Sequence, residues 1–451
     1  MKSTDYECVA GGFFCFYDDR PFTSQEETLE LKSENNEKII QLIDKGVEIP
    51  NPLTLGIGDE VEISRISGNG VKIYPGCRIY GKETVIAAGA QIGQEGPVTI
   101  ENCQIGPEVQ LKGGYFKKAA FLEKAGMGSG AHIREGCIFE EQANGAHCVG
   151  LKQTILFPFV TLGSLINFCD CLMAGGTSRK DHSEVGSSYI HFNFTPSGDK
   201  TTASLIGDVP RGVMLNQRAI FLGGQGGMVG PVRLGYGNVV VAGAILRKDV
   251  LADNNLIVPK TPRGGVFPLV SDSYTGLSRL LEKNILYLAN LAALEQWYIH
   301  VRQPFFTSRE LGDLIYAGVL DKLALAKKER IKRLKLMTDK IENSLEKHGD
   351  KGRAGARKRE LCDNIEQLSE LFLGEIVEKS GLEARDGFLE AFLDHTQQND
   401  GAYVEIVQGL PAVASEKGTA WLQEIIDEIS RQSAAILPGL ALFKRLITQP
   451  G

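Results

Sequence analysis

The chain has 451 residues, a length typical of two or three domains. Apolar residues make up 43% and charged residues 23%, which excludes a disordered or collagen-like chain. The net charge of −7 gives no overall attraction for nucleic acid. We expect no transmembrane helix, because no long apolar run occurs, and no secretory signal in residues 1–12. The nine scattered cysteines predict reduced thiols in a cytoplasmic protein.

Residues 1–49 are predicted to form an N-terminal extension with one helix. Thr23 and Glu26 have the spacing of a capping box, which marks a helix start. The helix is expected to run to Lys45, where Gly46 ends it.

Residues 50–262 carry a six-residue repeat. Aliphatic side chains recur at this spacing at both ends of the region, and residues 51–265 hold 35 of the 52 glycines. Such a period excludes an amphipathic helix, whose apolar stripe recurs at about 3.6 residues. It is typical of a three-sided solenoid, in which each flat face sends one aliphatic side chain inward and small residues allow the corners. A sandwich of short strands is the alternative, but the phase kept at both ends favours the β-solenoid.

Residues 263–451 are predicted to form an α-helical domain, after a linker at residues 261–265. We expect a buried helix at 277–302 and a capping box at Thr307 and Glu310. That box would start a helical hairpin with arms at about 308–347 and 356–379, and two or more helices would follow. Residues 322–359 carry 14 basic and 5 acidic side chains, but no aromatic residue interleaves them. A solvated helix face with local charge pairs is therefore favoured over a nucleic-acid site.

Polar residues are densest between positions 175 and 204, where a hydrophilic loop should leave the solenoid. Loops held by a rigid scaffold are where function concentrates. This stretch contains two histidines, His182 and His191, followed by Asn193, Lys200 and Thr201.

A glycine-rich stretch at residues 221–231 is expected to interrupt the six-residue phase. Backbone amides around Gly224 and Gly226 could bind phosphate or pantetheine, or the stretch could be a solenoid corner that needs positive φ. Both interpretations stay open. The histidines lack the spacing of a metal site, so we expect no catalytic metal.

The six-residue pattern resembles the hexapeptide-repeat family, which folds as a left-handed parallel β-helix. That resemblance implies a homotrimer with active sites in clefts between neighbouring β-helices. It also implies an acyltransferase that uses acyl-CoA and acts on a sugar phosphate or sugar nucleotide.

Within that family, the chain resembles the acetyltransferase half of the bifunctional N-acetylglucosamine-1-phosphate uridylyltransferase. Asn193 and the pair Lys200-Thr201 match residues of that family near its ligands. Arg134 and Lys152, 18 residues apart, match an Arg and a Lys that bind the sugar phosphate. One coil separates them, so their side chains should stack on one face. The cations Arg247 and Lys248 match a coil that faces the CoA phosphates.

The departures from the family pattern concern the catalytic base. Ser164 stands where the family has its histidine, and Asn167 stands where it has a tyrosine. The resemblance therefore leaves His191 or His182 to act as the base. We expect His191 to face the cleft, because residues two apart on a strand share a face and Asn193 lies two residues later. No nucleotidyltransferase motif occurs in residues 1–50, so uridylyl transfer is not expected.

Two functions follow from the sequence. The first is acetyl transfer from acetyl-CoA, or another acyl-CoA, to a sugar phosphate or sugar nucleotide. The alternative is a non-catalytic sugar-nucleotide-binding or scaffold protein that has lost the family's catalytic histidine. In the first, the predicted substrate-binding residues are Arg134, Lys152, Asn167, Asn193, Lys200 and Thr201, and the predicted cofactor-binding residues are Gly224, Gly226, Arg247 and Lys248.

Overall fold

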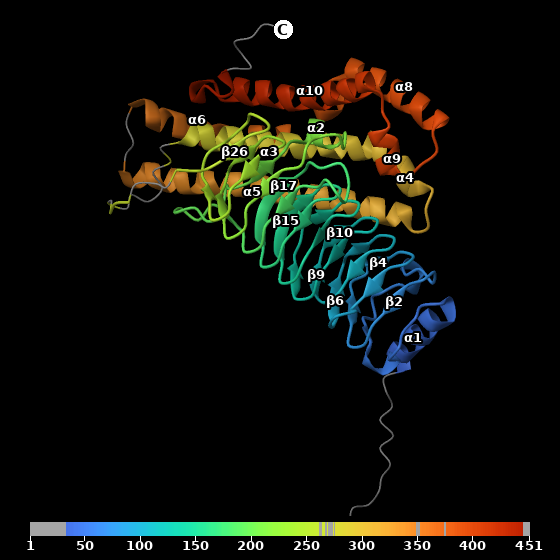
Figure 1. The fold of residues 1–451 in the computed structure, drawn as a ribbon. Helices are drawn as coiled ribbons and strands as arrows, with labels where there is room; N and C mark the ends of the chain where they lie inside the picture. Colours follow the sequence, from blue (N-terminus) through green and yellow to red (C-terminus); the bar gives the residue numbers. More distant parts are fainter. Residues whose placement is uncertain are drawn as a thin grey trace, which may run out of the picture.

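The computed structural model describes residues 33–260, 264–266, 268, 274, 276–348, 352–373 and 376–444. It shows a left-handed parallel β-helix followed by a region of α-helices (Figure 1). The β-helix begins next to α1 (Ser33–Lys45), and the C-terminal helices lie along one side of its middle and later coils. The expected fold class is therefore confirmed.

The β-helix has three faces, and every strand pairs in parallel with its counterpart in the next coil. Face 1 is a ten-stranded sheet of β2 (Lys72–Ile73), β5 (Gln91–Ile92), β8 (Gln110–Leu111), β11 (Gly126–Met127), β14 (Asn144–Gly145), β16 (Thr161–Leu162), β18 (Glu184–Val185), β21 (Phe221–Leu222), β24 (Val239–Val240) and β26 (Leu256–Ile257).

Faces 2 and 3 share two long strands, β15 (Gly150–Leu156) and β17 (Asn167–Met173), which bend across the corner between them. Face 2 also contains β1 (Gly56–Ile57), β3 (Arg78–Tyr80), β6 (Val98–Glu101), β9 (Gly114–Lys117), β12 (Ala131–Ile133), β19 (Ile190–Phe192), β22 (Gly227–Val229) and β25 (Ile245–Leu246). Face 3 contains β4 (Val85–Ile86), β7 (Gln104–Ile105), β10 (Ala119–Phe121), β13 (Cys137–Phe139), β20 (Ser204–Ile206) and β23 (Arg233–Leu234).

The six-residue repeat determines which side chains form the core. One aliphatic side chain from each face points inward, and the same position in the next coil stacks on it, so the coils bury their apolar side only against one another. The phase continues through the glycine-rich stretch, because five buried side chains follow at intervals of six: Leu222, Met228, Leu234, Val240 and Leu246. The expectation that residues 221–231 interrupt the phase is wrong.

Insertions leave the coils where polar residues are densest, as the sequence predicts. In a regular coil, residues that pair in register are about 18 positions apart in the sequence, as Ile133 and Leu151 are. Between His191 and Met228, which also lie in register, the chain inserts the loop at 193–203 and the short helix α2 (Val209–Gly212). A second loop at 174–183 leaves the corner between faces 3 and 1.

Helices make up the C-terminal region. They are α3 (Leu277–Trp297), the π-helix η3 (Tyr298–Arg302), α4 (Gln303–Thr307), α5 (Gly312–His348), α6 (Gly352–Leu371), α7 (Ile376–Lys379), α8 (Leu382–Gln398), α9 (Tyr403–Gln408), α10 (Ala412–Ile436) and the 3₁₀ turn η4 (Pro438–Leu440). Two more 3₁₀ turns, η1 (Pro52–Thr54) and η2 (Ile63–Arg65), lie in the first coil. No helix in the described part of the chain is long and apolar enough to span a membrane.

The capping box at Thr307 and Glu310 is wrong: Thr307 ends α4, and the Glu310 carboxylate accepts hydrogen bonds from Ser67 Oγ (2.8 Å) and Asn69 Nδ2 (3.1 Å). Thr23 and Glu26 lie outside the described residues, as does most of the linker at 261–265. The domain boundaries at 50 and 262 therefore stay predictions.

The helices cover face 3 and leave faces 1 and 2 open. Helix α5 packs on β7, β10 and β13, while α3 packs on β20. Buried polar contacts join the two regions: Arg330 of α5 pairs with Asp170 of β17 at 2.6 Å. Lys327 of α5 is also buried and pairs with Glu295 of α3 at 2.6 Å, so this part of the basic stretch is not the solvated face that the sequence favours. A local pair of the expected kind joins Arg333 to Glu329.

Candidate functional site

Arg134 and Lys152 lie side by side on the outside of face 2. Ile133 and Leu151 are in register, so the residues that follow them stack in successive coils, as the sequence predicts. Arg134 is exposed, and Lys152 Nζ pairs with the Glu135 carboxylate at 2.6 Å. Burial would raise the pKa of Glu135, but the hydrogen bond from Lys152 lowers it below its ordinary value, so the carboxylate is charged at neutral pH. The pair presents two cations on a flat outer face.

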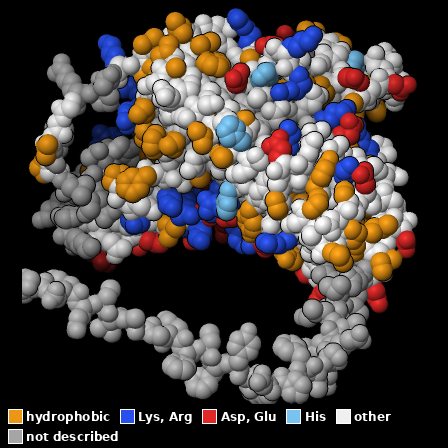
Figure 2. Space-filling view, turned by 60° about the horizontal axis from the view of Figure 1, so that its bottom comes forward, with side chains coloured by type: hydrophobic (Ala, Val, Ile, Leu, Met, Phe, Trp, Pro, Cys, Tyr) orange, Lys and Arg blue, Asp and Glu red, His pale blue; other side chains and the backbone are white. Residues whose placement is uncertain are grey.

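In the coils that precede Arg134 and Lys152, face 2 continues as a row of polar side chains. Glu101 accepts a hydrogen bond from Tyr115 at 3.0 Å and pairs with Lys117 at 2.8 Å. The Tyr115 ring lies against the ring of His132, with centroids 5.2 Å apart. Figure 2 shows that lysine and arginine side chains gather beside a histidine on one side of the molecule.

A serine and a histidine meet at the corner between faces 1 and 2. Ser164 Oγ lies 2.8 Å from His147 Nδ1, and the two residues are 17 positions apart, which is about one coil. The backbone N–H of Ser164 donates to Ser187 Oγ at 3.1 Å, so the next coil holds the serine in place. His147 is exposed and lines a groove of about 590 Å³ on face 1. The sequence reasoning missed His147, although its distance of one coil from Ser164 was a usable signal.

Asn167 connects the corner with the cation pair. It is the exposed first residue of β17 and lies in register with Gly150 of β15. Cys169, two residues later, is in register with Lys152, so Asn167 and Lys152 point out of the same face. The fold therefore gathers five polar residues within three coils: Arg134, His147, Lys152, Ser164 and Asn167.

His191 does not face a cleft, so the prediction of its orientation is wrong. The side chain is 2% exposed, and its Nε2 lies 2.8 Å from Ser204 Oγ inside the β-helix. Its neighbours Ile190 and Phe192 are the outward residues, at 41% and 37% exposure. Burial lowers the pKa of His191 to about 4, so it is a neutral core residue at pH 7. A base in this position could not reach a substrate on the outer surface.

His182 lies at the opposite edge of face 1 from Ser164. It sits in the loop before β18, whereas Ser187, the partner of Ser164, follows β18. Its Nδ1 is 3.0 Å from the Arg179 carbonyl oxygen, and its Nε2 is 3.8 Å from the Glu184 carboxylate. His182 therefore lies apart from the five gathered residues, and the structure does not support the base role predicted for it.

The loop at 193–203 carries the other predicted ligands. Lys200 is exposed, has a φ of +61° and accepts a hydrogen bond at its carbonyl oxygen from Arg330 Nη1 (3.3 Å). Asn193 is half-buried. Thr201 is fully buried, and both its hydroxyl (2.7 Å) and its N–H (3.0 Å) bond to Asp199 Oδ1. The substrate-binding prediction for Thr201 is therefore wrong, because its polar groups fix the loop from inside.

Gly224 and Gly226 form a tight corner between β21 and β22. A Cβ on Gly224 would lie 2.7 Å from the Ser187 carbonyl oxygen, and one on Gly226 would lie 2.8 Å from that of Ala244. The positive φ of this corner, +50°, falls on Gln225 between them. Close stacking of coils thus explains both glycines, and they leave no cradle for a cofactor. Arg247 and Lys248 are exposed directly after β25, where phosphates could reach them.

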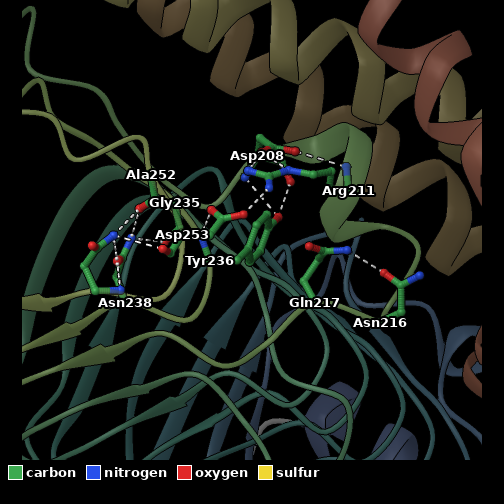
Figure 3. A network of polar contacts seen from close by, with 10 residues as sticks. Asp208, Arg211, Asn216, Gln217, Gly235, Tyr236, Asn238, Ala252 and Asp253 are labelled. Carbon is green, nitrogen blue, oxygen red and sulfur yellow. Dashed lines mark hydrogen bonds and ion pairs between the residues drawn. The ribbon is translucent and has the colours of Figure 1, made fainter.

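A second polar cluster serves structure only (Figure 3). Arg211 pairs with Asp208 and with Asp253, each at 2.7 Å, and its guanidinium lies over the Tyr236 ring at 4.6 Å. The Tyr236 hydroxyl donates to the Asp208 carbonyl oxygen at 2.6 Å. These bonds tie α2 to the last coils, and two carboxylates share the one guanidinium, so the cluster offers no unpaired cation to a ligand. In the described part of the chain, no three metal-ligating side chains come together.

The chain is similar to several proteins named bifunctional protein GlmU. It is 28% identical to that of Thermotoga maritima over 226 residues, which is 50% of this chain and 44% of the relative. It is 27% identical to that of Trichlorobacter lovleyi over 225 residues, covering 50% and 43%. The chain thus spans less than half the length of these relatives, and no family model matches it. Together with the parallel β-helix, this similarity confirms the resemblance to the hexapeptide-repeat acetyltransferase half of GlmU.

Proposed function

We propose that this protein transfers an acetyl group from acetyl-CoA to an amino group of a sugar phosphate or sugar nucleotide, with His147 as general base. The observation that carries the proposal is the 2.8 Å contact between His147 Nδ1 and Ser164 Oγ. This contact supports the proposal, because an imidazole lies next to position 164, where the resemblance has its histidine and this chain has a serine.

The serine fixes the orientation of the imidazole ring. When Nδ1 carries the proton and donates it to Ser164 Oγ, Nε2 keeps its lone pair and can accept a proton. The acceptor amine would attack the thioester carbonyl carbon, lose its proton to Nε2, and form an amide as the carbon–sulfur bond breaks. The CoA thiolate leaves and takes up a proton. Acetyl-CoA supplies the activated acetyl group, and Arg247 and Lys248 would bind its phosphates.

The cations of face 2 would hold the phosphate of the acceptor. Arg134 can offer two parallel N–H donors, and Lys152 a point charge, to the same anion. Lys152 would give up part of its bond to Glu135 when the ligand binds. Asn167 lies between this pair and the Ser164 corner, so it could bind the sugar ring. Lys200 and Asn193 would reach the ligand from the loop at 193–203.

A homotrimer would complete this site, because one open face makes only half a cleft. Face 3 is covered by α3 and α5, whereas faces 1 and 2 expose large apolar side chains in their last coils. Ile190, Phe192 and Ile245 lie on face 2, and Phe221, Val239 and Leu256 lie on face 1. Contiguous exposed apolar side chains of this kind mark interaction surfaces. Sedimentation at micromolar concentration should give three chains per particle, and a stable monomer would contradict an intersubunit site.

The cytoplasmic location also stays a prediction.

An acetyl-transfer assay with acetyl-CoA and glucosamine-1-phosphate tests the base. Wild type should release CoA, and His147→Ala should lower kcat by about 100-fold or more, the usual contribution of a general base. His182→Ala should match wild type, since that ring lies at the far edge of face 1. Equal kcat in His147→Ala and wild type would disprove the base role. A wild-type protein that binds UDP-N-acetylglucosamine yet transfers nothing would favour the non-catalytic alternative.

A further inference from the structure

A basic cavity lies at the junction of the β-helix and the helical region, away from faces 1 and 2. Its volume is about 670 Å³, and its walls come from β23, α3, α6, α10 and the segment after η4. Four cationic and two anionic side chains line it: Arg233, Arg279, Arg357, Lys444, Glu282 and Asp427. The cavity therefore carries an excess of positive charge.

The two acids are already partly engaged. Glu282 Oε1 accepts the Phe443 N–H at 2.8 Å, and Asp427 Oδ1 accepts a hydrogen bond from Gln423 Nε2 at 2.8 Å. Each bond uses one carboxylate oxygen on a neutral donor. The acids thus help to shape the cavity, and their two negative charges offset only part of the four positive charges around it, with Glu282 acting on Arg233.

The arginines of the cavity have guanidinium N–H donors that a ligand could use. Arg357 donates from Nε to the Gly439 carbonyl oxygen at 2.9 Å, which leaves its two terminal nitrogens to point elsewhere. Among the described residues, no hydrogen bond or ion pair engages the guanidinium of Arg233 or of Arg279. Burial lowers the pKa of Arg233, although Asp249 nearby opposes this shift. A half-buried cation without an ion-pair partner is costly, and an anionic ligand would offset that cost.

We propose that this cavity binds a nucleoside diphosphate. Arginine guanidinium groups match phosphate oxygens with two parallel donors, and three arginines from three elements suit two phosphoryl groups better than one. The volume lies within the range of small-molecule sites and exceeds what an inorganic ion fills. Leu286, Leu440 and Phe443 line the same cavity and provide an apolar wall for a base. The site is distinct from Arg134 and Lys152 on face 2, and its occupation does not depend on acetyl transfer.

Calorimetric titration of the full chain with ADP and with inorganic pyrophosphate tests this proposal. Wild type should bind both, and ADP more tightly because the apolar wall contacts the base. Arg279→Gln and Arg357→Gln should each weaken binding by about tenfold or more, the effect of losing one charge-assisted bond. Arg279 is exposed, so its replacement should leave the melting temperature unchanged.

Two controls separate this site from others. Arg353→Gln changes an exposed cation on the same helix as Arg357 that does not line the cavity, and it should bind like wild type. Lys152→Ala should also bind pyrophosphate like wild type, even if it abolishes acetyl transfer. Unchanged affinity in Arg279→Gln, or no binding of either probe at millimolar concentration, would overturn the proposal. Equal affinity for ADP and pyrophosphate would overturn the contact with the base.

Discussion

The buried ion pair between Arg330 and Asp170 offers a direct test of how the helical region supports the β-helix. The two side chains are 2% and 6% exposed, and Arg330 Nη2 lies 2.6 Å from Asp170 Oδ1. Arg330→Met keeps most of the side-chain volume and removes the charge. Asp170 would then be a buried carboxylate without its partner, which costs about 3–5 kcal/mol of unfolding free energy. Urea denaturation followed by fluorescence of the buried Trp297 and Trp421 measures this loss.

The pH dependence of that loss has a definite sign. Burial raises the pKa of Asp170 even with Arg330 nearby, and removing Arg330 should raise it further. A carboxyl whose folded pKa lies above its unfolded value binds more protons when folded, so stability falls as pH rises through that interval. Arg330→Met should therefore be destabilised less at pH 5 than at pH 7.5. Adding Asp170→Asn should restore most of the stability, because the uncompensated charge disappears.

A surface pair between α5 and α6 is the matched control. Lys335 pairs with Glu366, but their side chains are 39% and 72% exposed, so Lys335→Met should cost under about 1 kcal/mol. The reasoning fails if Arg330→Met unfolds within about 1 kcal/mol of wild type at both pH values. It also fails if Asp170→Asn brings no recovery.

Two further predictions concern buried groups. The pKa of His191 falls from 6.5 to about 4 in the folded protein, so stability should decrease by up to about 3 kcal/mol as pH drops through that interval, and urea midpoints of His191→Asn should lose this dependence. Among the described cysteines, exposed Cys148 should react with a thiol reagent within minutes in native buffer. Cys103 should react only after unfolding, because burial raises its pKa to about 11, and mass spectrometry of partially labelled protein distinguishes the two.

The six-residue phase predicts the solenoid, because the inward side chains repeat at a spacing that only a three-sided coil explains. The same phase also predicts that the His191 side chain points inward, because it lies six residues after the buried Val185. The sequence analysis instead grouped His191 with the polar Asn193 two residues later and placed the histidine outside. The fold does the opposite, since Ser204 supplies a hydrogen bond to the imidazole within the core. In a regular solenoid, position in the repeat is therefore a better guide than polarity.

Regular coils also explain which site residues could be found. Arg134 and Lys152 belong to uninterrupted coils, so a spacing of 18 is enough to stack them. The contact between His147 and Ser164 follows from similar counting, with a spacing of 17 across one shorter coil. His147 lies one coil before Ser164, whereas both predicted bases, His182 and His191, lie after it.

Contacts between the two regions could not be read from local pattern at all. The loop that carries Lys200 is held by Arg330 of α5 at its carbonyl oxygen. Asp199 in the same loop accepts a hydrogen bond from the Tyr274 hydroxyl at 2.7 Å, and the Thr201 carbonyl oxygen accepts one from Asn284 of α3. These partners lie 75 to 130 residues further along the chain, beyond any periodic signal. Because three helical-region side chains fix one loop of the β-helix, the helical region is part of the scaffold of the proposed site, and the two predicted domains act there as one unit.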